Sequence, residues 1–233
     1  MGADFARVGM LLSNPARARM LNLLLTGQAL PASELCHAAG VALSTGSEHL
    51  AELTAGGLIQ VETHGRHRYY SLAGPKVGEA LESLAGICSQ TPVRNLRESI
   101  ARERLRRART CYDHLAGMVG VALLDTMLTQ GLMEQSNGDC SLTVRGEARL
   151  ERLGIDVDAA KRSRRAFAGL CLDWTERRHH LGGSLGAAIS SLVIDKGWLK
   201  RTGASRALSM SATGAEQLLS LGLPRTIVRA LAS

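Results

Sequence analysis

Residues 43–72 read LSTGSEHLAELTAGGLIQVETHGRHRYYSL, and this stretch decides the fold of the N-terminal part of the chain. Its first half places small polar side chains on one face of an expected helix over residues 44–55 and leucines on the opposite face. A pair of glycines ends that helix. An alternating strand, a turn at His64-Gly65 and a basic returning strand follow. The pattern predicts a polar helix that enters the major groove of DNA beside a two-stranded wing.

The residues on either side of this stretch predict the other helices of a helix-turn-helix domain. Asn14 and Pro15 cap and open a helix that runs to Leu25. A second short helix is expected over residues 33–39, and a tight turn then leads into the polar helix. After the wing, residues 75–89 form a further helix that a proline opens.

The polar helix and the wing supply candidate DNA contacts. Ser44 is expected to cap the helix and to touch a phosphate group. Tyr69 and Tyr70 are more typical of packing within a hairpin than of base stacking. The alternative for the helix is an ordinary surface helix without a DNA contact. We assign contacts with base edges to Thr45, Ser47, Glu48 and His49, and contacts of one side of the wing with phosphates or the minor groove to His64, Arg66 and Arg68.

Length and composition indicate a protein of two mainly helical domains. The chain has 233 residues, of which 45% are hydrophobic and only 3% aromatic, and this balance favours helices. No apolar stretch approaches the ~20 residues that cross a bilayer, and the N-terminus lacks the layout of a signal peptide. The five cysteines are too sparse for a disulfide framework. We therefore expect a cytoplasmic protein with no membrane partner.

The formal net charge of +7 is unevenly distributed. Residues 1–90 hold six basic and seven acidic side chains, so the expected DNA-binding domain is not itself basic. Residues 94–109 hold seven arginines, which is more than one helix face can carry. We interpret this segment as a solvated connecting helix. The alternative is a helix that lies over flanking DNA and adds salt-sensitive affinity.

A motif in the second half of the chain occurs twice. HLAG at residues 114–117, followed by Gly120, recurs 66 residues later as HLGG at residues 180–183, followed by Gly186. Each copy continues as an apolar helix, a hairpin and a short helix. The first hairpin is expected to turn at Asn137-Gly138. The repetition predicts a duplicated domain.

These patterns predict a mainly α fold with short β-hairpins, in which an N-terminal winged helix-turn-helix is joined to a duplicated helix-hairpin-helix domain. The expected boundaries are 1–91 for the DNA-binding domain, 92–110 for an Arg-rich connecting helix, and 111–233 for a duplicated sensor and dimerisation domain. A long helical pattern runs from Pro92 to about Gln130.

The tripeptide pattern Cys-x-Asp also occurs twice, each time near a histidine. If the two copies pack symmetrically, these residues converge at the interface that the copies share. Two thiolates and two imidazoles suit zinc or another thiophilic metal in a tetrahedral site. The first cysteine and histidine have the spacing of one helix face, whereas the second pair needs a bend between them. The candidate metal ligands are Cys111, His114, Cys171 and His180.

Other roles remain open for these cysteines and histidines. They are compatible with packing and helix capping, with a thiol redox switch, and with a pocket for an organic ligand. Cys36, Cys88 and Cys140 have no partner at a useful spacing and are interpreted as packing residues. For a metal ion at the four candidate ligands, the residue types do not distinguish zinc from another thiophilic metal.

Residues 8–90 resemble the ArsR/SmtB family of winged-helix transcriptional regulators, and the resemblance covers a little over a third of the chain. It implies a homodimer built on terminal helices, which binds an imperfect inverted repeat in double-stranded DNA and represses transcription until an inducer arrives. The matching motifs, in order, are LSNPAR at 12–17, SEL at 33–35, LSTGSEHL at 43–50, GLI at 57–59 and GRHRYYSL at 65–72.

The chain departs from the metal-sensing members of that family. Arsenic-sensing members carry Glu-Leu-Cys-x-Cys where this chain has ELCHA at residues 34–38, so the second thiol is missing. The paired ligands of zinc-sensing members are not apparent in residues 75–88. Inducer sensing is therefore expected in the C-terminal extension.

The combined prediction is a dimeric transcriptional regulator, expected to act as a repressor, whose C-terminal domain senses a metal, a redox change or a small molecule. One alternative is a constitutive architectural DNA-binding protein. Another is an enzyme that uses a cysteine and a histidine as a nucleophile pair. The sequence contains no recognisable oxyanion loop, phosphate loop or metal-hydrolase motif, so we predict that the protein is not an enzyme.

Overall fold

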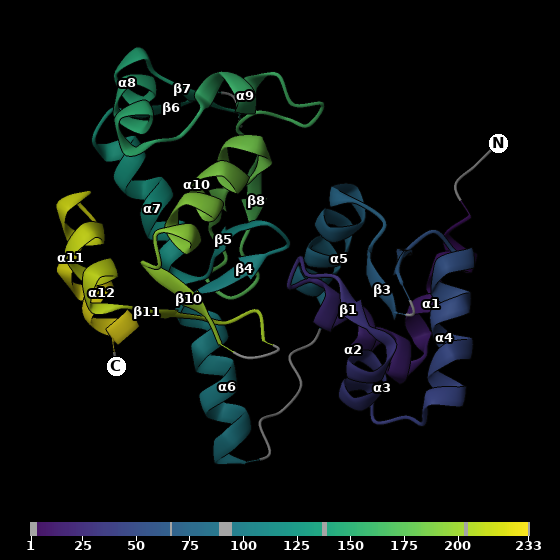
Figure 1. Cartoon of the computed structure of the whole chain (residues 1–233). Helices are drawn as coiled ribbons and strands as arrows, with labels where there is room; N and C mark the ends of the chain where they lie inside the picture. The colour runs from purple at the N-terminus through teal and green to yellow at the C-terminus, as the bar shows by residue number, and fades with distance from the viewer. Residues whose placement is uncertain (1–3, 66, 89–94, 137–138, 203–204, 233) are drawn as a thin grey trace. The chain divides into compact units, whose positions relative to one another are not determined.

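The computed structural model describes the chain except residues 1–3, 66, 89–94, 137–138, 203–204 and 233. It forms two compact units, Met1–Leu81 and Glu82–Ser233, which we describe separately (Figure 1). Within the described residues, no helix is both long enough and apolar enough to cross a membrane.

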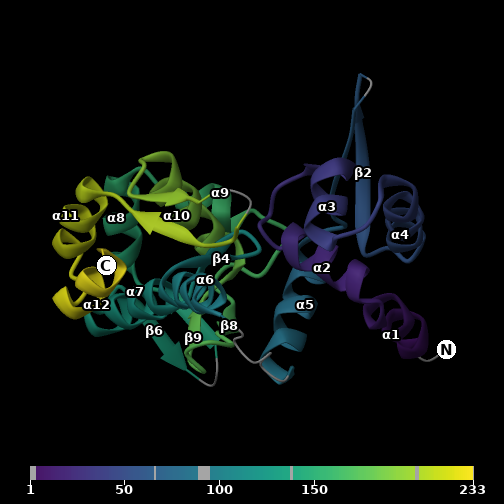
Figure 2. The ribbon, with the colours of Figure 1, turned by 90° about the horizontal axis from the view of Figure 1, so that it is seen from below.

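The first unit is a winged helix-turn-helix. Its helices surround a small antiparallel sheet in which the strand order is β1-β3-β2. Figure 2 shows the β2–β3 hairpin projecting beyond the helices. The elements are α1 (Phe5–Ser13), α2 (Pro15–Leu24), β1 (Leu30–Pro31), α3 (Ala32–Ala39), α4 (Leu43–Ala55), β2 (Ile59–His64), β3 (His67–Leu72) and α5 (Pro75–Ile87), the last of which crosses the boundary between the units.

Local sequence explains where these helices begin and end. The Asn14 side chain accepts hydrogen bonds from the backbone N–H groups of Ala16 and Arg17, as the predicted cap requires. Gly40 ends α3 in the left-handed conformation, with φ of 71°. The unit then closes around a buried apolar core, which includes Met20, Leu21, Leu24, Leu35, Leu50, Leu53 and Ile59.

The predicted cap of α4 is wrong by two residues. The helix begins at Leu43, and the capping position is Ala42, whose backbone is extended and whose carbonyl accepts the first helical hydrogen bond from Gly46. Ser44 therefore lies inside the first turn and does not cap the helix. Its hydroxyl is exposed to solvent and remains available to a DNA phosphate.

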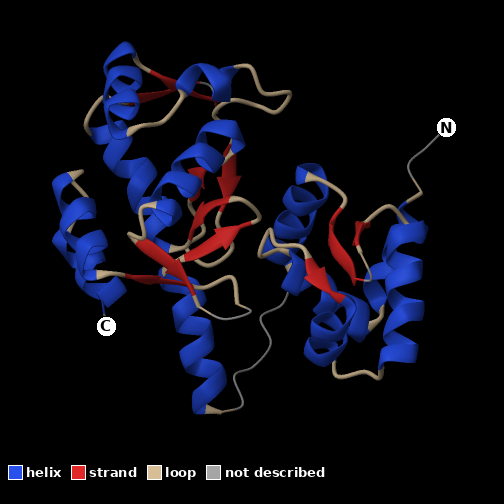
Figure 3. Cartoon of the chain, viewed as in Figure 1, coloured by secondary structure: helices blue, strands red, loops and turns tan. Residues whose placement is uncertain are grey.

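The second unit consists of helices and short antiparallel hairpins (Figure 3). In its described residues, the strands pair as β4-β5, β6-β7, β8-β9 and β10-β11. The elements are α6 (Leu96–Arg107), β4 (Arg109–Cys111), β5 (His114–Ala116), α7 (Met118–Thr129), β6 (Met133–Ser136), β7 (Asp139–Leu142), α8 (Val144–Leu153), α9 (Val157–Lys161), β8 (Leu170–Leu172), β9 (His179–Leu181), α10 (Gly183–Asp195), β10 (Leu199–Arg201), β11 (Leu208–Met210), α11 (Ala212–Ser220) and α12 (Arg225–Ala232).

The apolar helices α7 and α10 form the centre of this unit. Helix α7 packs against β9, and α10 packs against β5, so each helix covers the hairpin that precedes the other. The core between them is continuous and includes Val119, Leu185 and Leu199. Helices α11 and α12 lie together at one edge of the unit in both views (Figures 1 and 2).

The long helix predicted from Pro92 to Gln130 is wrong. Helix α6 stops at Arg107, because Ala108 adopts an extended backbone and Arg109 enters strand β4. Gly117, with φ of 74°, then starts the separate helix α7. The expected turn residues Asn137 and Gly138 lie outside the described residues, although the flanking residues are paired in the β6-β7 hairpin.

Candidate functional site

The outward face of α4 is polar and accessible. Gly46, Leu50 and Leu53 are buried and define its inner face. Because successive helical residues are rotated by about 100°, Ser44 and Glu48 lie one turn apart on the opposite side. The predicted base-contact residues Thr45 and Ser47 flank them, and all four of these polar side chains are exposed.

The structure limits two of the predicted contacts on this helix. The Ser47 hydroxyl donates its hydrogen bond to the carbonyl oxygen of Leu43 at 2.8 Å. Toward DNA it can therefore act only as a hydrogen-bond acceptor. His49 is only half-exposed, and its Nδ1 atom is buried with no hydrogen-bond partner among the described residues. Thr45 and Glu48 are therefore better placed than His49 for contacts with base edges.

Gly46 is a packing residue, which the sequence pattern did not indicate. A Cβ atom at this position would lie 2.0 Å from Cys36 Sγ and 3.3 Å from Cys36 Cβ. Helices α3 and α4 therefore approach closely at a point where a larger side chain does not fit. Glycine at position 46 sets the angle at which the outer face of α4 is presented.

The predicted arrangement of the wing side chains is wrong in part. His64 pairs with His67, and Thr63 pairs with Arg68, so the turn lies one residue later than expected. Directly paired residues share a face and successive residues alternate, so His64 and Arg68 lie on opposite faces of the hairpin. Both side chains are exposed. Arg66, which was predicted to join them, lies outside the described residues.

The wing tyrosines contribute to packing. Tyr70 is buried in the first unit, and the Tyr69 ring lies edge-on to the His64 ring, with 5.9 Å between their centroids. This arrangement matches the predicted packing role: Tyr70 is buried, and the half-exposed Tyr69 packs against a neighbouring wing side chain.

The Arg-rich segment does not form a uniformly solvated helix. Its last arginine, Arg109, is in β4, where its side chain is completely buried and lies over the Trp174 ring at 4.7 Å. On α6, Arg106 forms an ion pair with Glu176 at 3.1 Å. Arg94 lies outside the described residues. Besides Arg106, the exposed arginines of α6 are Arg97, Arg102 and Arg104.

Two hairpins of the second unit hold a compact cluster of cysteine and histidine side chains. Cys111 pairs with His114 across β4 and β5, and Cys171 pairs with His180 across β8 and β9. The prediction that the first two residues share a helix face is therefore wrong. Tyr112, with φ of 58°, begins the tight turn that brings them opposite each other.

The four side chains meet in the interior of the unit. Cys111 Sγ lies 3.7 Å from Cys171 Sγ, and His114 Nε2 lies 3.1 Å from His180 Nε2. All four potential ligand atoms lie within 4.8 Å of one another. Cys111 and both histidines are buried, and Cys171 is half-buried. We name this group the Cys/His cluster.

A carboxylate stands behind each histidine of the cluster. Asp113 Oδ1 lies 3.3 Å from His114 Nδ1, and this aspartate is paired with Arg165. Asp173 Oδ2 lies 3.2 Å from His180 Nδ1. Both imidazoles thus present Nε2 to the centre of the cluster and Nδ1 to a negative charge.

Asp173 also makes hydrogen bonds and an ion pair that connect the cluster to neighbouring side chains and backbone. It is completely buried and forms an ion pair with Arg109 at 3.0 Å. Its Oδ2 accepts a hydrogen bond from the backbone N–H of Gly117 at 2.6 Å, and its Oδ1 accepts from Thr175. These contacts hold the pKa of Asp173 well below its usual range despite burial, so this side chain is a carboxylate.

The electrostatics of the cluster favour a thiolate paired with an imidazolium. A hydrogen bond from Cys111 lowers the pKa of Cys171 to about 2, against the opposing effect of burial. Burial would lower the pKa of His114, but hydrogen bonds to Asp113 and Cys171 raise it to about 9. The pKa of Cys111 is raised well above its usual value by the same hydrogen bond to Cys171. Such a group can bind a cation in place of its protons or undergo thiol oxidation.

Matching glycines allow the hairpins and helices to approach each other. A Cβ atom at Gly120 would lie 2.4 Å from the Leu115 carbonyl oxygen, and one at Gly186 would lie 2.4 Å from that of Leu181. These glycines belong to the repeated motif, but the spacing of the motif residues did not indicate that they are packing positions. It also did not indicate the contacts that Arg109 and Asp173 make. The repeat itself was the signal that could have indicated them.

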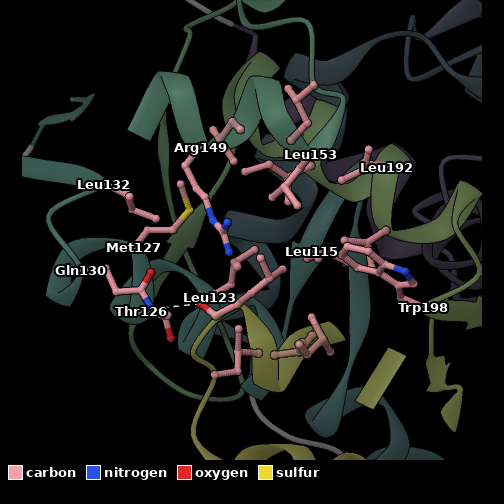
Figure 4. Close-up of a pocket in the computed structure, with 18 residues that line it drawn as sticks. Leu115, Leu123, Thr126, Met127, Gln130, Leu132, Arg149, Leu153, Leu192 and Trp198 are labelled. Carbon is pink, nitrogen blue, oxygen red and sulfur yellow. Dashed lines mark hydrogen bonds between the residues drawn. The ribbon is translucent and has the colours of Figure 1, made fainter. Parts of the chain in front are cut away.

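A separate apolar pocket lies between α7, α8 and α10 (Figure 4). Its empty volume is about 640 Å³, which includes space open to solvent. Leucine side chains form much of its wall, and Figure 4 shows the Arg149 side chain extending among them. Gln130, at the edge, donates a hydrogen bond to the Leu221 carbonyl oxygen. The part of this space that is open to a bound molecule is about 40 Å³, well below the roughly 300–1,000 Å³ of ligand pockets, so in this conformation it has no room for an organic ligand.

The fold and the exposed polar helix define a DNA-binding transcriptional regulator of the winged helix-turn-helix class. Residues 12–62 match the model of a helix-turn-helix domain family. The chain is 39% identical over 214 residues to the uncharacterised HTH-type transcriptional regulator YdfF of Bacillus subtilis, covering 92% of this chain and 95% of that protein.

Two shorter similarities concern the first unit. A Mycobacterium tuberculosis HTH-type transcriptional regulator, Rv0324, is 38% identical over 72 residues, or 31% of each chain. The homodimeric winged helix-turn-helix domain of Mb0332 from Mycobacterium bovis, a possible ArsR-family regulator, is 25% identical and covers 41% of this chain and 98% of that chain, with a TM-score of 0.34. The chain therefore belongs to the HTH-type transcriptional regulators, and its first unit has the winged helix-turn-helix fold that its motifs predicted.

Proposed function

We propose that this regulator is a homodimeric repressor that binds an imperfect inverted repeat and responds to an effector bound by its second unit. The observation that carries the DNA-binding part is the exposed polar face of α4 beside a projecting hairpin. In a twofold dimer, two such helices enter successive major grooves roughly 34 Å apart, which requires an operator with related half-sites.

Exposed apolar side chains on α1 support dimerisation through the first unit. Phe5 is 81% exposed and Met10 is 64% exposed, and Val8 is exposed on the same short helix. A second copy of the chain that covered these side chains would remove apolar surface from water, which stabilises an interface. Terminal helices are also where the family resemblance places the dimer.

The Cys/His cluster supports an effector role for the second unit. It is buried, it contains groups that exchange protons for metal ions or react with oxidants, and it joins the two hairpins of the unit. Regulation requires that the effector bind one conformation of the regulator better than the other.

The order of elements in the second unit supports the proposal that this unit is duplicated. The series β4, β5, α7, β6, β7, α8, α9 is followed by β8, β9, α10, β10, β11, α11, α12 in the same order of element types. Thr143 caps α8 and Ser211 caps α11 in the same way, each accepting from a backbone N–H three residues later. Duplication would account for the meeting of two similar hairpins, β4-β5 and β8-β9, at the Cys/His cluster.

The test is fluorescence anisotropy of the full-length protein with DNA from upstream of its own gene, at moderate salt. Thr45→Ala should weaken specific binding by roughly 5- to 100-fold, because contacts with base edges are worth ~1–3 kcal/mol. Thr213→Ala is the matched control, since Thr213 is an exposed residue in the first turn of α11. A regulator that shows no saturable binding, or that responds equally to both substitutions, would refute the proposed DNA contact.

A further inference from the structure

We propose that the Cys/His cluster is a closed, tetrahedral binding site for a zinc-type thiophilic divalent ion, and that this ion is the effector of the regulator. The regulatory part rests on the function proposed above, whereas the binding site stands on its own geometry. The four ligands are Cys111, His114, Cys171 and His180.

The sulfur–sulfur and nitrogen–nitrogen distances in the cluster are close to those of a tetrahedral site. With zinc–sulfur bonds of about 2.3 Å and tetrahedral angles, two sulfur ligands lie roughly 3.8 Å apart, and Cys111 Sγ and Cys171 Sγ lie 3.7 Å apart. With zinc–nitrogen bonds of about 2.0–2.1 Å, two nitrogen ligands lie roughly 3.3 Å apart, and the two Nε2 atoms lie 3.1 Å apart. A tetrahedral ion would hold each sulfur roughly 3.6 Å from each nitrogen, whereas the four ligand atoms spread over 4.8 Å, so binding requires the sulfur pair and the nitrogen pair to approach each other by up to about 1 Å.

The orientation of the imidazoles is also that of metal ligands. Each Nδ1 faces a carboxylate, Asp113 behind His114 and Asp173 behind His180, which favours a proton on Nδ1 and a lone pair on Nε2. Without an ion, a proton on His114 Nε2 bridges the two rings at 3.1 Å; a bound cation would take the place of that proton. Carboxylates behind metal-bound histidines orient the rings and increase the basicity of the ligands.

Charge balance favours a divalent ion. Two cysteine thiolates neutralise one divalent cation, and the two carboxylates are already paired, Asp113 with Arg165 and Asp173 with Arg109. The buried assembly would then carry no net charge, which avoids the cost of an unpaired buried charge. Sulfur and imidazole ligands disfavour Mg²⁺ and Ca²⁺, which prefer oxygen.

The predicted consequence of binding is mechanical. One cysteine and one histidine come from the β4-β5 hairpin, and one of each comes from the β8-β9 hairpin. An ion bound to all four therefore crosslinks two segments that lie more than fifty residues apart in the chain. All four positions of the ion are filled by protein, so the site suits a structural or sensory ion rather than a hydrolytic one.

The binding experiment uses the full-length protein, reduced and stripped with a chelator, and titrated with Co²⁺ as the probe. We expect one cobalt per chain, intense tetrahedral d–d absorption and thiolate-to-cobalt charge transfer, all of which zinc should displace. Cys171→Ser and His180→Ala should abolish this spectrum. Cys140→Ser and His179→Ala are the matched controls, because they remove a half-buried cysteine and an exposed neighbouring histidine outside the cluster.

A further variant separates a loss of metal binding from a loss of folding. Asp113 is partly exposed, so Asp113→Asn should leave the fold intact, as circular dichroism can verify. It should weaken cobalt binding by ~10–100-fold, the usual effect of removing a carboxylate behind a histidine ligand. A weak octahedral spectrum, or an unchanged spectrum in the cysteine and histidine variants, would overturn the site. A disulfide between Cys111 and Cys171 that forms in place of metal binding would do the same.

The effector role is tested separately by DNA affinity with and without zinc. We expect a change of ~5- to 150-fold, the usual range of allosteric coupling, and its loss in Cys171→Ser. Stoichiometric cobalt binding without any zinc effect on DNA affinity would refute the effector role and leave the site standing. Specific DNA binding without cobalt binding would refute the site and leave the DNA-binding function standing.

Discussion

The contact between Gly46 and Cys36 allows a quantitative test of how the recognition helix is held. Replacement of glycine by alanine inside an exposed helix usually stabilises a protein by about 0.5–1 kcal/mol. At position 46, however, the new Cβ atom would lie 2.0 Å from Cys36 Sγ, a distance at which the neighbouring helix must move. Overpacking of this kind costs about 1–3 kcal/mol, so Gly46→Ala should destabilise the first unit by about 1–2 kcal/mol.

The assay is urea and thermal unfolding of the full-length protein, monitored at the transition of the first unit. A loss of 1 kcal/mol lowers the melting temperature of a unit of this size by about 4–8 °C. Cys36→Ala in the same chain removes the sulfur, but Cys36 Cβ would still lie 3.3 Å from the new Cβ. The double variant should therefore recover only part of the lost stability. An increase in stability for Gly46→Ala alone would show that α3 and α4 do not approach as closely as described.

Five further substitutions, at four positions, test other parts of the structure. Gly186→Ala places a Cβ atom 2.4 Å from the Leu181 carbonyl oxygen and 3.3 Å from His114 Cβ, so it should destabilise the second unit and weaken cobalt binding. Gly86→Ala is the control, because there is open space around Gly86. It should stabilise α5 by about 0.5–1 kcal/mol, as measured by thermal unfolding. Asn14→Ala removes the cap of α2 and should cost about 1 kcal/mol in urea unfolding, and Asn14→Asp should retain most of that stability. Arg109→Met leaves the buried Asp173 carboxylate without its cation and should cost about 3–5 kcal/mol; an unfolding midpoint equal to that of the parent protein would contradict the buried pair.

The path from the Cys/His cluster to the rest of the regulator begins at Asp173. This carboxylate contacts His180, Arg109 and the backbone of Gly117, so a change in the position of His180 acts on the start of α7 and on β4. Arg109 also donates to the Leu105 carbonyl oxygen near the end of α6. Helix α6 is the element of the second unit that follows the winged helix-turn-helix domain in sequence, which makes it the natural place to measure an effector-dependent change by hydrogen exchange.

The first unit shows how far local sequence can predict structure. The cap at Asn14, the glycine after α3 and the alternation along the wing each depend on residues within a few positions of one another, and the elements they predicted are present. The errors there are a cap misplaced at Ser44 and a turn misplaced by one residue. Both are small along the chain, but the second reverses which wing side chains share a face.

For the second unit, the sequence by itself determined that two similar motifs each carry a cysteine and a histidine. The spacing of Cys111 and His114 fits a helix face and a tight hairpin equally well, and nothing local distinguishes them. Tertiary contacts decided in favour of the hairpin: Arg109 is bridged to Ala207, and the Gly117 N–H donates to Asp173, 56 residues away. Interactions at that separation form only after the chain has folded, because their geometry depends on the packing of distant segments rather than on neighbouring residues.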